Sequence, residues 1–150
     1  MEKEKDQSLF PNSGKSNIIA HALRLTPGAD LFKSIKSFVE KNKIKAGFIM
    51  TCVGSLKEIN IRLANADKFL VKKENYEIVS LVGCFGCEGR IHLHISLGDH
   101  NGNVIGGHLK ENNIVYTTAE IVIGELPELT FTEVRNKGED WPELNINKNK

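Results

Sequence analysis

Apolar and polar residues alternate with a period of two along much of this chain. Ile91, Leu93, Ile95 and Leu97 alternate with polar residues or glycine, and residues 59–63 repeat the pattern. Further runs rich in apolar or β-branched residues occur at 18–25, 46–53, 78–82, 115–123 and 129–134. Such runs are typical of β-strands with one or both faces buried. The chain is therefore constrained to a fold built mainly on a sheet, with a polar loop expected at 65–75.

One helix interrupts the strand pattern. Its apolar positions recur at the i, i+4, i+7, i+8 spacing of one helix face, at Leu31, Ile35, Phe38 and Val39. Thr26 is the expected N-cap, Pro27 the expected first helical residue, and the helix should end near Asn42. A parallel sheet would need more helices between its strands. We therefore predict a compact α+β domain with a largely antiparallel sheet and one or two packed helices.

The chain has 150 residues, which suits a single domain. We predict disordered polar tails at 1–17 and 146–150 around a domain at 18–145. The net charge is +1 and the lysines are interspersed with acidic residues, so nothing resembles the basic stripe of a nucleic-acid-binding protein. No apolar run is long enough for a membrane span, and the polar start lacks a signal peptide. With only three cysteines, these features predict an intracellular protein, cytoplasmic or nuclear.

The segment 90–109, RIHLHISLGDHNGNVIGGHL, is the most informative part of the chain. His92 and His94 are two residues apart on a predicted strand, so they share a face. A three-residue hairpin loop at 100–102, with Gly102 in the left-handed position, would pair Asp99 with Asn103. That register places His108 opposite His94, and all three histidines converge.

Three converging imidazoles form an open metal site, with a fourth position for water or ligand. The expected cofactor is a divalent metal ion. Imidazole ligands suit zinc, copper, iron and nickel, and zinc is the favoured metal. The alternative is that these are polar residues on a solvated strand face. A loop of two or four residues would turn His108 to the opposite face.

Other residues could carry chemistry. Glu120 is a candidate general base or fourth ligand, although a solvated strand position explains it equally well. Arg24 and Arg62 are single charges in apolar strands, so each could bind an anionic ligand or pair with a carboxylate across a subunit boundary. Cys84 and Cys87 form a lone C-x-x-C that follows a strand, where small strand-end residues explain it better than redox chemistry.

The sequence resembles the plants-and-prokaryotes-conserved (PPC) domain over about residues 20–145. The resemblance is carried by five segments in order: RLTPGADLFKSI (24–35), AGFIMTCVGSL (46–56), YEIVSLVGCFG (76–86), HLHISLGDHNGNVIGGHL (92–109) and TTAEIVIGELPELTF (117–131). It implies a compact α+β fold that assembles as a homotrimer. It also implies a metal held by the histidines of HLHxSL and GGH, which here are His92, His94 and His108.

The resemblance leaves the biological role open. In plants the domain is joined to AT-hooks and mediates self-association, nuclear localisation and protein contacts. This chain has no Arg-Gly-Arg-Pro hook, so we expect the stand-alone type and no direct DNA binding. The expected role is binding of a small-molecule ligand or a metal-assisted reaction, and the alternative is a regulatory protein-interaction module. The family is expected to have an arginine directly after the Phe-Thr pair. This sequence has Glu133 at that position, and Arg135 is the candidate to take over the role of the arginine.

Overall fold

The computed structural model describes residue 10, residues 12–65 and residues 67–150, and it consists of one sheet, one helix and a separate hairpin. The first half of the predicted tail, residues 1–9 and 11, lies outside the described residues. The elements are β1 (Ile19–Leu25), α2 (Leu31–Lys41), β2 (Ala46–Arg62), β3 (Phe69–Lys72), β4 (Tyr76–Gly86), β5 (Ile91–Gly98), β6 (Val104–Leu109), β7 (Ile114–Glu125), β8 (Leu129–Val134) and β9 (Glu143–Lys148).

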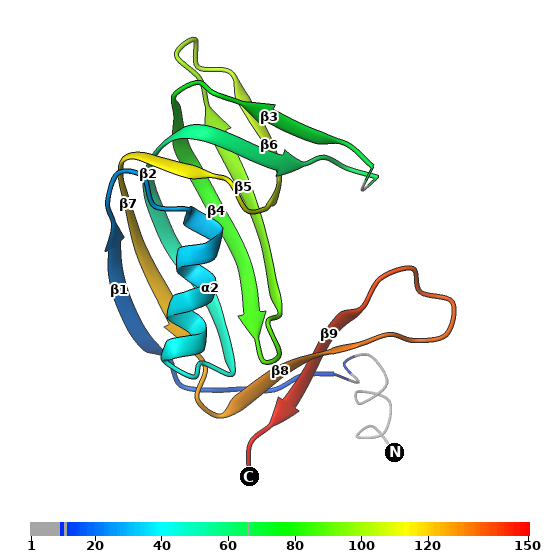
Figure 1. Ribbon diagram of the computed structural model, residues 1–150. Coiled ribbons are helices and arrows are strands. Elements are labelled where there is room, and N and C mark those ends of the chain that lie inside the picture. Colours follow the sequence, from blue (N-terminus) through cyan, green and yellow to red (C-terminus); the bar gives the residue numbers. More distant parts are fainter. Residues whose placement is uncertain (1–9, 11, 66) are drawn as a thin grey trace.

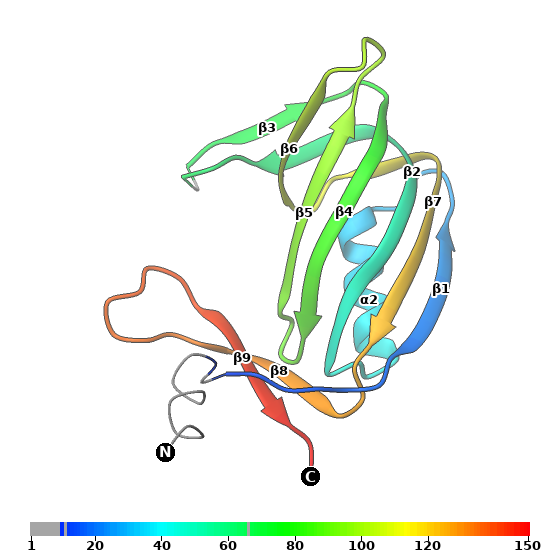
Figure 2. The ribbon, with the colours of Figure 1, turned by 180° about the vertical axis from the view of Figure 1, so that it is seen from behind.

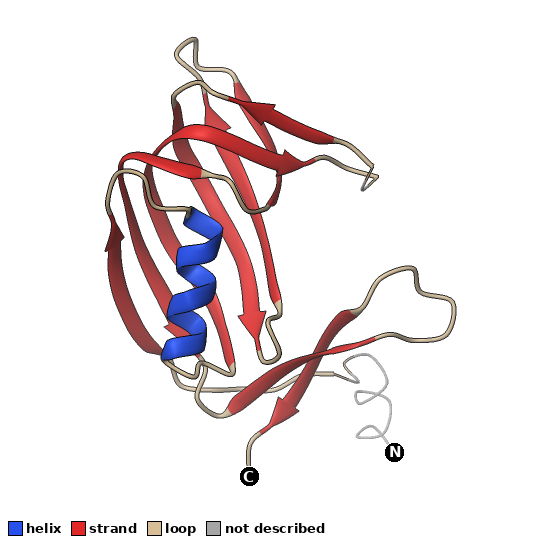
Figure 3. Ribbon diagram, viewed as in Figure 1, coloured by secondary structure: helices blue, strands red, loops and turns tan. Residues whose placement is uncertain are grey.

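The main sheet has seven strands in the order β1-β7-β2-β4-β5-β6, with β3 paired to β2. All strand pairings among the described residues are antiparallel. The far end of β2 also pairs with β6, so β2, β4, β5 and β6 form a closed circuit. The predicted α+β class with an antiparallel sheet is confirmed, with α2 as the single helix of the described residues (Figure 3).

Helix α2 covers one face of the sheet (Figure 1). Its residues Leu31, Ile35 and Val39 are at most 3% exposed and belong to the same core cluster as Leu93 and Ile95 of β5. No helix of the described residues lies over the opposite face, which is seen in Figure 2. The alternating residues of β5 therefore divide into a buried set under the helix and a set on the outer face.

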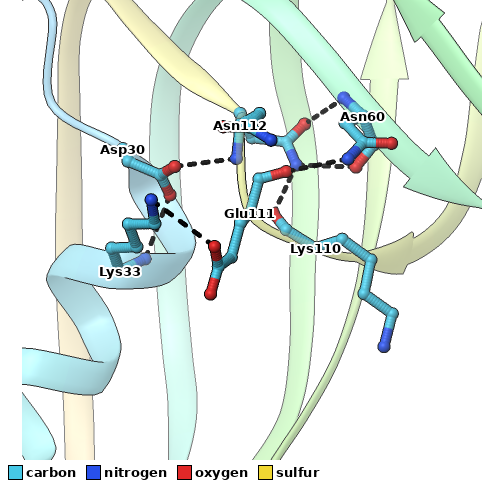
Figure 4. Close-up of polar contacts among 7 residues, drawn as sticks. Asp30, Lys33, Asn60, Lys110, Glu111 and Asn112 are labelled. Carbon is cyan, nitrogen blue, oxygen red and sulfur yellow. Dashed lines mark hydrogen bonds and ion pairs between the residues drawn. The ribbon is translucent and has the colours of Figure 1, made fainter.

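The start of α2 differs from the prediction. The N-cap is Asp30 rather than Thr26, and its Oδ1 accepts a hydrogen bond from the Lys33 backbone N at 3.0 Å. Its Oδ2 accepts from the Asn112 backbone N at 2.7 Å (Figure 4). Thr26 instead lies in a turn in which its carbonyl accepts from Ala29 N. A carboxylate with two backbone donors outcompetes a hydroxyl as the cap, because charge-assisted hydrogen bonds are stronger. The helix ends at C-cap Asn42, as predicted.

Asn113 joins three parts of the chain from a fully buried position. Its Oδ1 accepts from the Asn60 backbone N at 3.0 Å, and its Nδ2 donates to the carbonyls of Asn60 at 2.8 Å and Lys110 at 2.7 Å. The network fixes the start of β7 against β2 beside the helix N-terminus (Figure 4).

Three other boundaries differ from those expected. Strand β2 is continuous through Gly54, where the prediction ended a strand. A Cβ at Gly54 would lie 2.0 Å from the Thr118 carbonyl oxygen. The glycine therefore allows β7 to approach β2 closely, and it does not end the strand. The polar segment 65–75 contains the edge strand β3. Strand β9 reaches Lys148, beyond the boundary set at residue 145.

The described part of the predicted N-terminal tail lies along the β8–β9 hairpin. Asn12 Nδ2 donates to Asn145 Oδ1 at 2.8 Å, and Asn12 Oδ1 accepts from Ile146 N at 2.7 Å. Asn17 donates to both carboxylate oxygens of Glu128. Asn12 and Asn17, both before β1, are thus hydrogen-bonded to the C-terminal hairpin and to the turn that precedes it. Among the described residues, no helix has the length and apolar character needed to cross a membrane.

Candidate metal centre

The β5–β6 turn sets the register on which the candidate site depends. Asp99 Oδ1 accepts hydrogen bonds from the backbone N of Asn101 and of Asn103, both at 2.9 Å. Gly102 has φ +80°, which fits the left-handed position predicted for it. The Asp99 backbone N donates to the Asn103 carbonyl at 2.9 Å. The loop is therefore residues 100–102, as predicted.

With that register, His94 lies directly opposite His108, and Ser96 opposite Gly106. His92 shares the outer face with His94, while Leu93 between them is buried. The predicted convergence of the three histidines on one face is confirmed as geometry.

The imidazole nitrogens lie at distances that suit a shared ion. Nε2 of His92 is 3.2 Å from Nε2 of His94, which is 3.2 Å from Nδ1 of His108. One nitrogen from each ring lies within 4.8 Å of the other two. Ligand nitrogens about 2.0–2.1 Å from a tetrahedral zinc ion are themselves roughly 3.3 Å apart. Two of the three nitrogen–nitrogen separations match this value, and the third is within 4.8 Å.

The surroundings keep two of these rings neutral. Partial burial, together with the positive charge of Arg62 and of the neighbouring histidines, lowers the pKa of His108 to about 4. Burial, followed by the charges of His94 and Arg90, lowers the pKa of His92. An imidazole ligates a metal only in its neutral form. At neutral pH both rings are therefore ready to bind without first losing a proton.

A cavity of about 680 Å³ opens beside His92 and His108. Its wall also includes Arg62 at the end of β2, Arg90 before β5 and Trp141 before β9. This volume is in the range of ordinary small-molecule sites. Two of the three histidines, His92 and His108, therefore line this space.

Arg90 is a buried charge with an incomplete set of partners. The residue is 6% exposed, and its Nη1 donates to Glu133 Oε1 at 3.0 Å. Its buried Nε has no hydrogen-bond acceptor among the described residues. Glu133, the residue that replaces the family's expected arginine, therefore serves here as the ion-pair partner of Arg90.

Arg62 also lines the cavity, and its strand partner is His108. Its guanidinium carbon is 5.7 Å from the centre of the Trp141 ring, a cation–π contact. Among the described residues its side chain has no ion-pair partner within the chain.

The other candidate residues lie elsewhere. Glu120 is on β7, which is separated from β5 by β2 and β4, and its strand neighbours are Arg24 and Val53. The structure does not bring Glu120 to the histidines. Arg24 Nε donates to Thr118 Oγ1 at 3.0 Å. Cys84 and Cys87 are both free thiols.

Sequence reasoning did not connect Arg90, Trp141 and Glu143 with the site. Arg90 directly precedes the alternating strand and is two residues from His92, as His94 is. This spacing was the sequence signal that could have linked Arg90 with the histidines. Trp141 and Glu143 reach the cavity only because β8 and β9 form a hairpin that lies outside the main sheet. Nothing local in the sequence reports that placement.

Comparison with families shows that the profile described as the Plants and Prokaryotes Conserved (PCC) domain matches residues 12–127. This is the family called PPC above, and the resemblance read from the five segments is confirmed.

Solved structures share the fold. A hypothetical protein from Salmonella cholerae-suis is 35% identical with a TM-score of 0.87, covering 90% of this chain and 97% of that one. A plant- and prokaryote-conserved protein from Pyrococcus horikoshii is 31% identical with a TM-score of 0.70, covering 83% and 91%. A metal-containing protein from Archaeoglobus fulgidus is 27% identical with a TM-score of 0.64, covering 77% and 84%.

Curated relatives include the bifunctional protein GlmU of Synechococcus sp. (strain JA-3-3Ab), 36% identical over 128 residues, which are 85% of this chain and 20% of that protein. AT-hook motif nuclear-localized protein 2 of Arabidopsis thaliana is 26% identical over 140 residues, 88% of this chain and 40% of that protein. The chain thus spans between a fifth and two fifths of the length of these relatives.

Proposed function

Because this chain belongs to the Plants and Prokaryotes Conserved (PCC) domain family, we propose that it is a homotrimeric metal-binding protein with one ligand pocket per subunit. His92, His94 and His108 hold a divalent ion, zinc in the first place. The pocket beside them binds a small molecule or supports a metal-assisted reaction. The observation that carries the proposal is the 3.2 Å spacing of the imidazole nitrogens on two adjacent strands.

The donor set fits a zinc ion. Three imidazole ligands with an open fourth position are typical of zinc that acts on a ligand rather than zinc that only supports the fold. Such an ion supplies Lewis-acid polarisation to a group bound at the open position. The chain's own residues contribute orientation: the Asp99 turn holds the strand pair β5–β6, which carries all three rings. The metal-containing relative from Archaeoglobus fulgidus supports the same assignment.

The outer face of the sheet supports self-association. Met50 and Val53 of β2 and Val79 and Val82 of β4 are each 48–56% exposed on the two central strands. A solvated antiparallel face would normally carry polar side chains there. A contiguous aliphatic face is typical of a protein–protein interface, and further copies of this chain are the proposed occupants. Val82 is the strand partner of His94, so the candidate centre lies beside this face.

Elemental analysis of untagged protein tests the metal assignment. We expect close to one zinc per chain in the parent and in a His100→Ala control, because His100 is exposed in the β5–β6 turn. His94→Ala should lose the metal while keeping its circular dichroism. Metal absent from the parent after incubation with zinc, iron and manganese would overturn the metal centre. Light scattering tests assembly, with a mass three times that of the 16.7 kDa chain expected.

A second candidate is a regulatory protein-interaction module, favoured by the likeness to AT-hook nuclear-localized proteins. This reading makes the outer face a site for other proteins and the location nuclear rather than cytoplasmic. It predicts partner binding that is unchanged in His94→Ala. Direct DNA binding should be weak at physiological salt, because a net charge of +1 gives little phosphate neutralisation.

A further inference from the structure

The cavity beside the histidines contains an arginine that is available to a ligand. Arg62 is partly buried in the cavity wall, and its guanidinium contacts the Trp141 ring rather than a carboxylate. Among the residues that the structure describes, no side chain forms an ion pair or hydrogen bond with it. Arginines that are removed from water are ordinarily paired, since the planar fork of donors matches a carboxylate or phosphate. An anion is the partner that this guanidinium lacks.

Arg90, in the same cavity wall, points to the same conclusion. It is 6% exposed, and its one ion-pair partner among the described residues is Glu133, whose side chain is 47% exposed. One of its buried N–H donors, Nε, has no acceptor among the described residues. A half-solvated carboxylate compensates a buried charge only partly. An anion within the cavity would be stabilised by both arginines.

The charges of the cavity wall indicate which anion fits. Glu133, Asp140 and Glu143 line the same cavity as Arg62 and Arg90, and Glu133 is the ion-pair partner of Arg90. Two arginines and a divalent ion exceed three carboxylates by a single positive charge. This excess matches a monocarboxylate better than a phosphate ester, which carries close to two negative charges at neutral pH.

The shape of the wall indicates the rest of the ligand. Trp141 is 59% exposed and Pro142 lies next to it in the cavity wall, which gives a flat apolar surface beside the Arg62 guanidinium. Flat apolar groups pack on such a surface by offset stacking. The cavity is therefore lined by the arginine donors, by the apolar surface of Trp141 and Pro142, and by His92 and His108.

We propose that the cavity binds a small organic monocarboxylate with a flat apolar body, whose carboxylate pairs with Arg62 and whose body packs against Trp141, beside the ion on the histidines. This inference rests on the proposed function, because it names the ligand class of the same pocket. It adds Arg62 as the residue that determines specificity for an anion and Trp141 as the apolar platform.

Trp141 makes the test direct, because it is the single tryptophan of the chain. Its fluorescence is followed in the zinc-loaded full-length protein during titration with benzoate, with benzamide as the neutral isostere and phenyl phosphate as the dianion. We expect saturable binding of benzoate with a Kd on the order of 1 mM or below, and benzamide weaker by about tenfold or more. Equal responses to benzoate and benzamide, or tighter binding of phenyl phosphate, would overturn the proposal.

Matched arginine variants locate the site. Arg62→Met keeps most of the side-chain volume and should weaken benzoate binding by about tenfold or more. Arg24→Met, on β1 at the other side of the sheet, should bind benzoate as the parent does. Unchanged binding in folded Arg62→Met would overturn the proposal, and if that variant does not fold, the benzoate–benzamide comparison in the parent decides.

The same samples separate this inference from the proposed function. Zinc content is measured before each titration. Protein that holds zinc but gives no saturable benzoate response overturns the carboxylate pocket and leaves the metal centre in place. Protein that never holds zinc overturns the metal centre itself.

Discussion

Nε2 of His94 on β5 lies 3.2 Å from Nδ1 of His108 on β6, across a strand pair in which the two residues are direct partners. Two nitrogens at this distance can share a proton or bind a common cation. His92 adds a third nitrogen on the same face. A shared proton would engage only two of the rings, whereas a bound cation would engage all three.

Zinc should stabilise the fold through these rings. A ligand that binds only the native state at a hundred times its Kd adds about 2.7 kcal/mol to the free energy of unfolding. For a chain of this size that corresponds to a rise in Tm of roughly 5–10 °C. Differential scanning fluorimetry with and without zinc should show the rise in the parent and in His100→Ala. A rise of the same size in His94→Ala would contradict the assignment.

The metal-free protein should lose stability in mildly acidic solution. The pKa of His108 is near 6.5 in an unfolded chain and about 4 in the fold. Between these values the unfolded state binds more protons, so the free energy of unfolding falls as pH falls from 6.5 to 4. We expect a loss on the order of 1–2 kcal/mol, allowing for solvent access to the ring.

Urea denaturation of the metal-free protein at pH 7.5, 6, 5 and 4 measures this loss. His108→Asn removes the titrating group and should flatten the dependence over this range. An equal slope in parent and variant would assign the acid sensitivity to other groups.

Two glycines should respond very differently to alanine. At Gly83, with φ +133°, a Cβ would lie 2.1 Å from the His92 carbonyl oxygen, so β4 and β5 would have to separate. At Gly102, with φ +80°, a Cβ meets nothing within 4 Å. We expect Gly83→Ala to cost at least about 3 kcal/mol and Gly102→Ala about 1 kcal/mol, the backbone term alone. Equal unfolding free energies in the two variants would refute the steric argument.

Asn113→Ala should destabilise the protein strongly. The side chain is fully buried and its loss leaves the Asn60 backbone N and the Lys110 carbonyl without their partner. Stranded buried polar groups cost about 1–3 kcal/mol each, so a total of roughly 2–4 kcal/mol is expected by chemical denaturation. Asn101→Ala, at an exposed turn position, should change the unfolding free energy by less than about 0.5 kcal/mol.

The histidine geometry could be predicted from the sequence because every determinant of it is local. Asp99 and Gly102 specify the loop length, loop length specifies the register, and register places His108 opposite His94. The amphipathic stripe of α2 is local in the same sense.

The features that could not be predicted depend on contacts between distant segments. Asp30 replaces Thr26 as the helix cap because it also binds Asn112, which is 82 residues away. From the sequence, Gly54 is expected to end a strand. In the structure it lies within β2, and a side chain there would collide with the backbone of β7. The cavity joins the end of β2 and the start of β5 to the loop before β9, so Arg62 and Trp141 meet across just over half the length of the chain.

The hydrogen bond between Asn12 and Asn145 has a consequence for how this unit can be combined with others. The segment that precedes β1 and the last strand, β9, lie side by side at this hydrogen bond. A host protein could therefore accept the unit at a single loop, or carry it at either end, without disturbing the sheet. Circular permutants that join these two ends through a short linker should fold with the cavity intact.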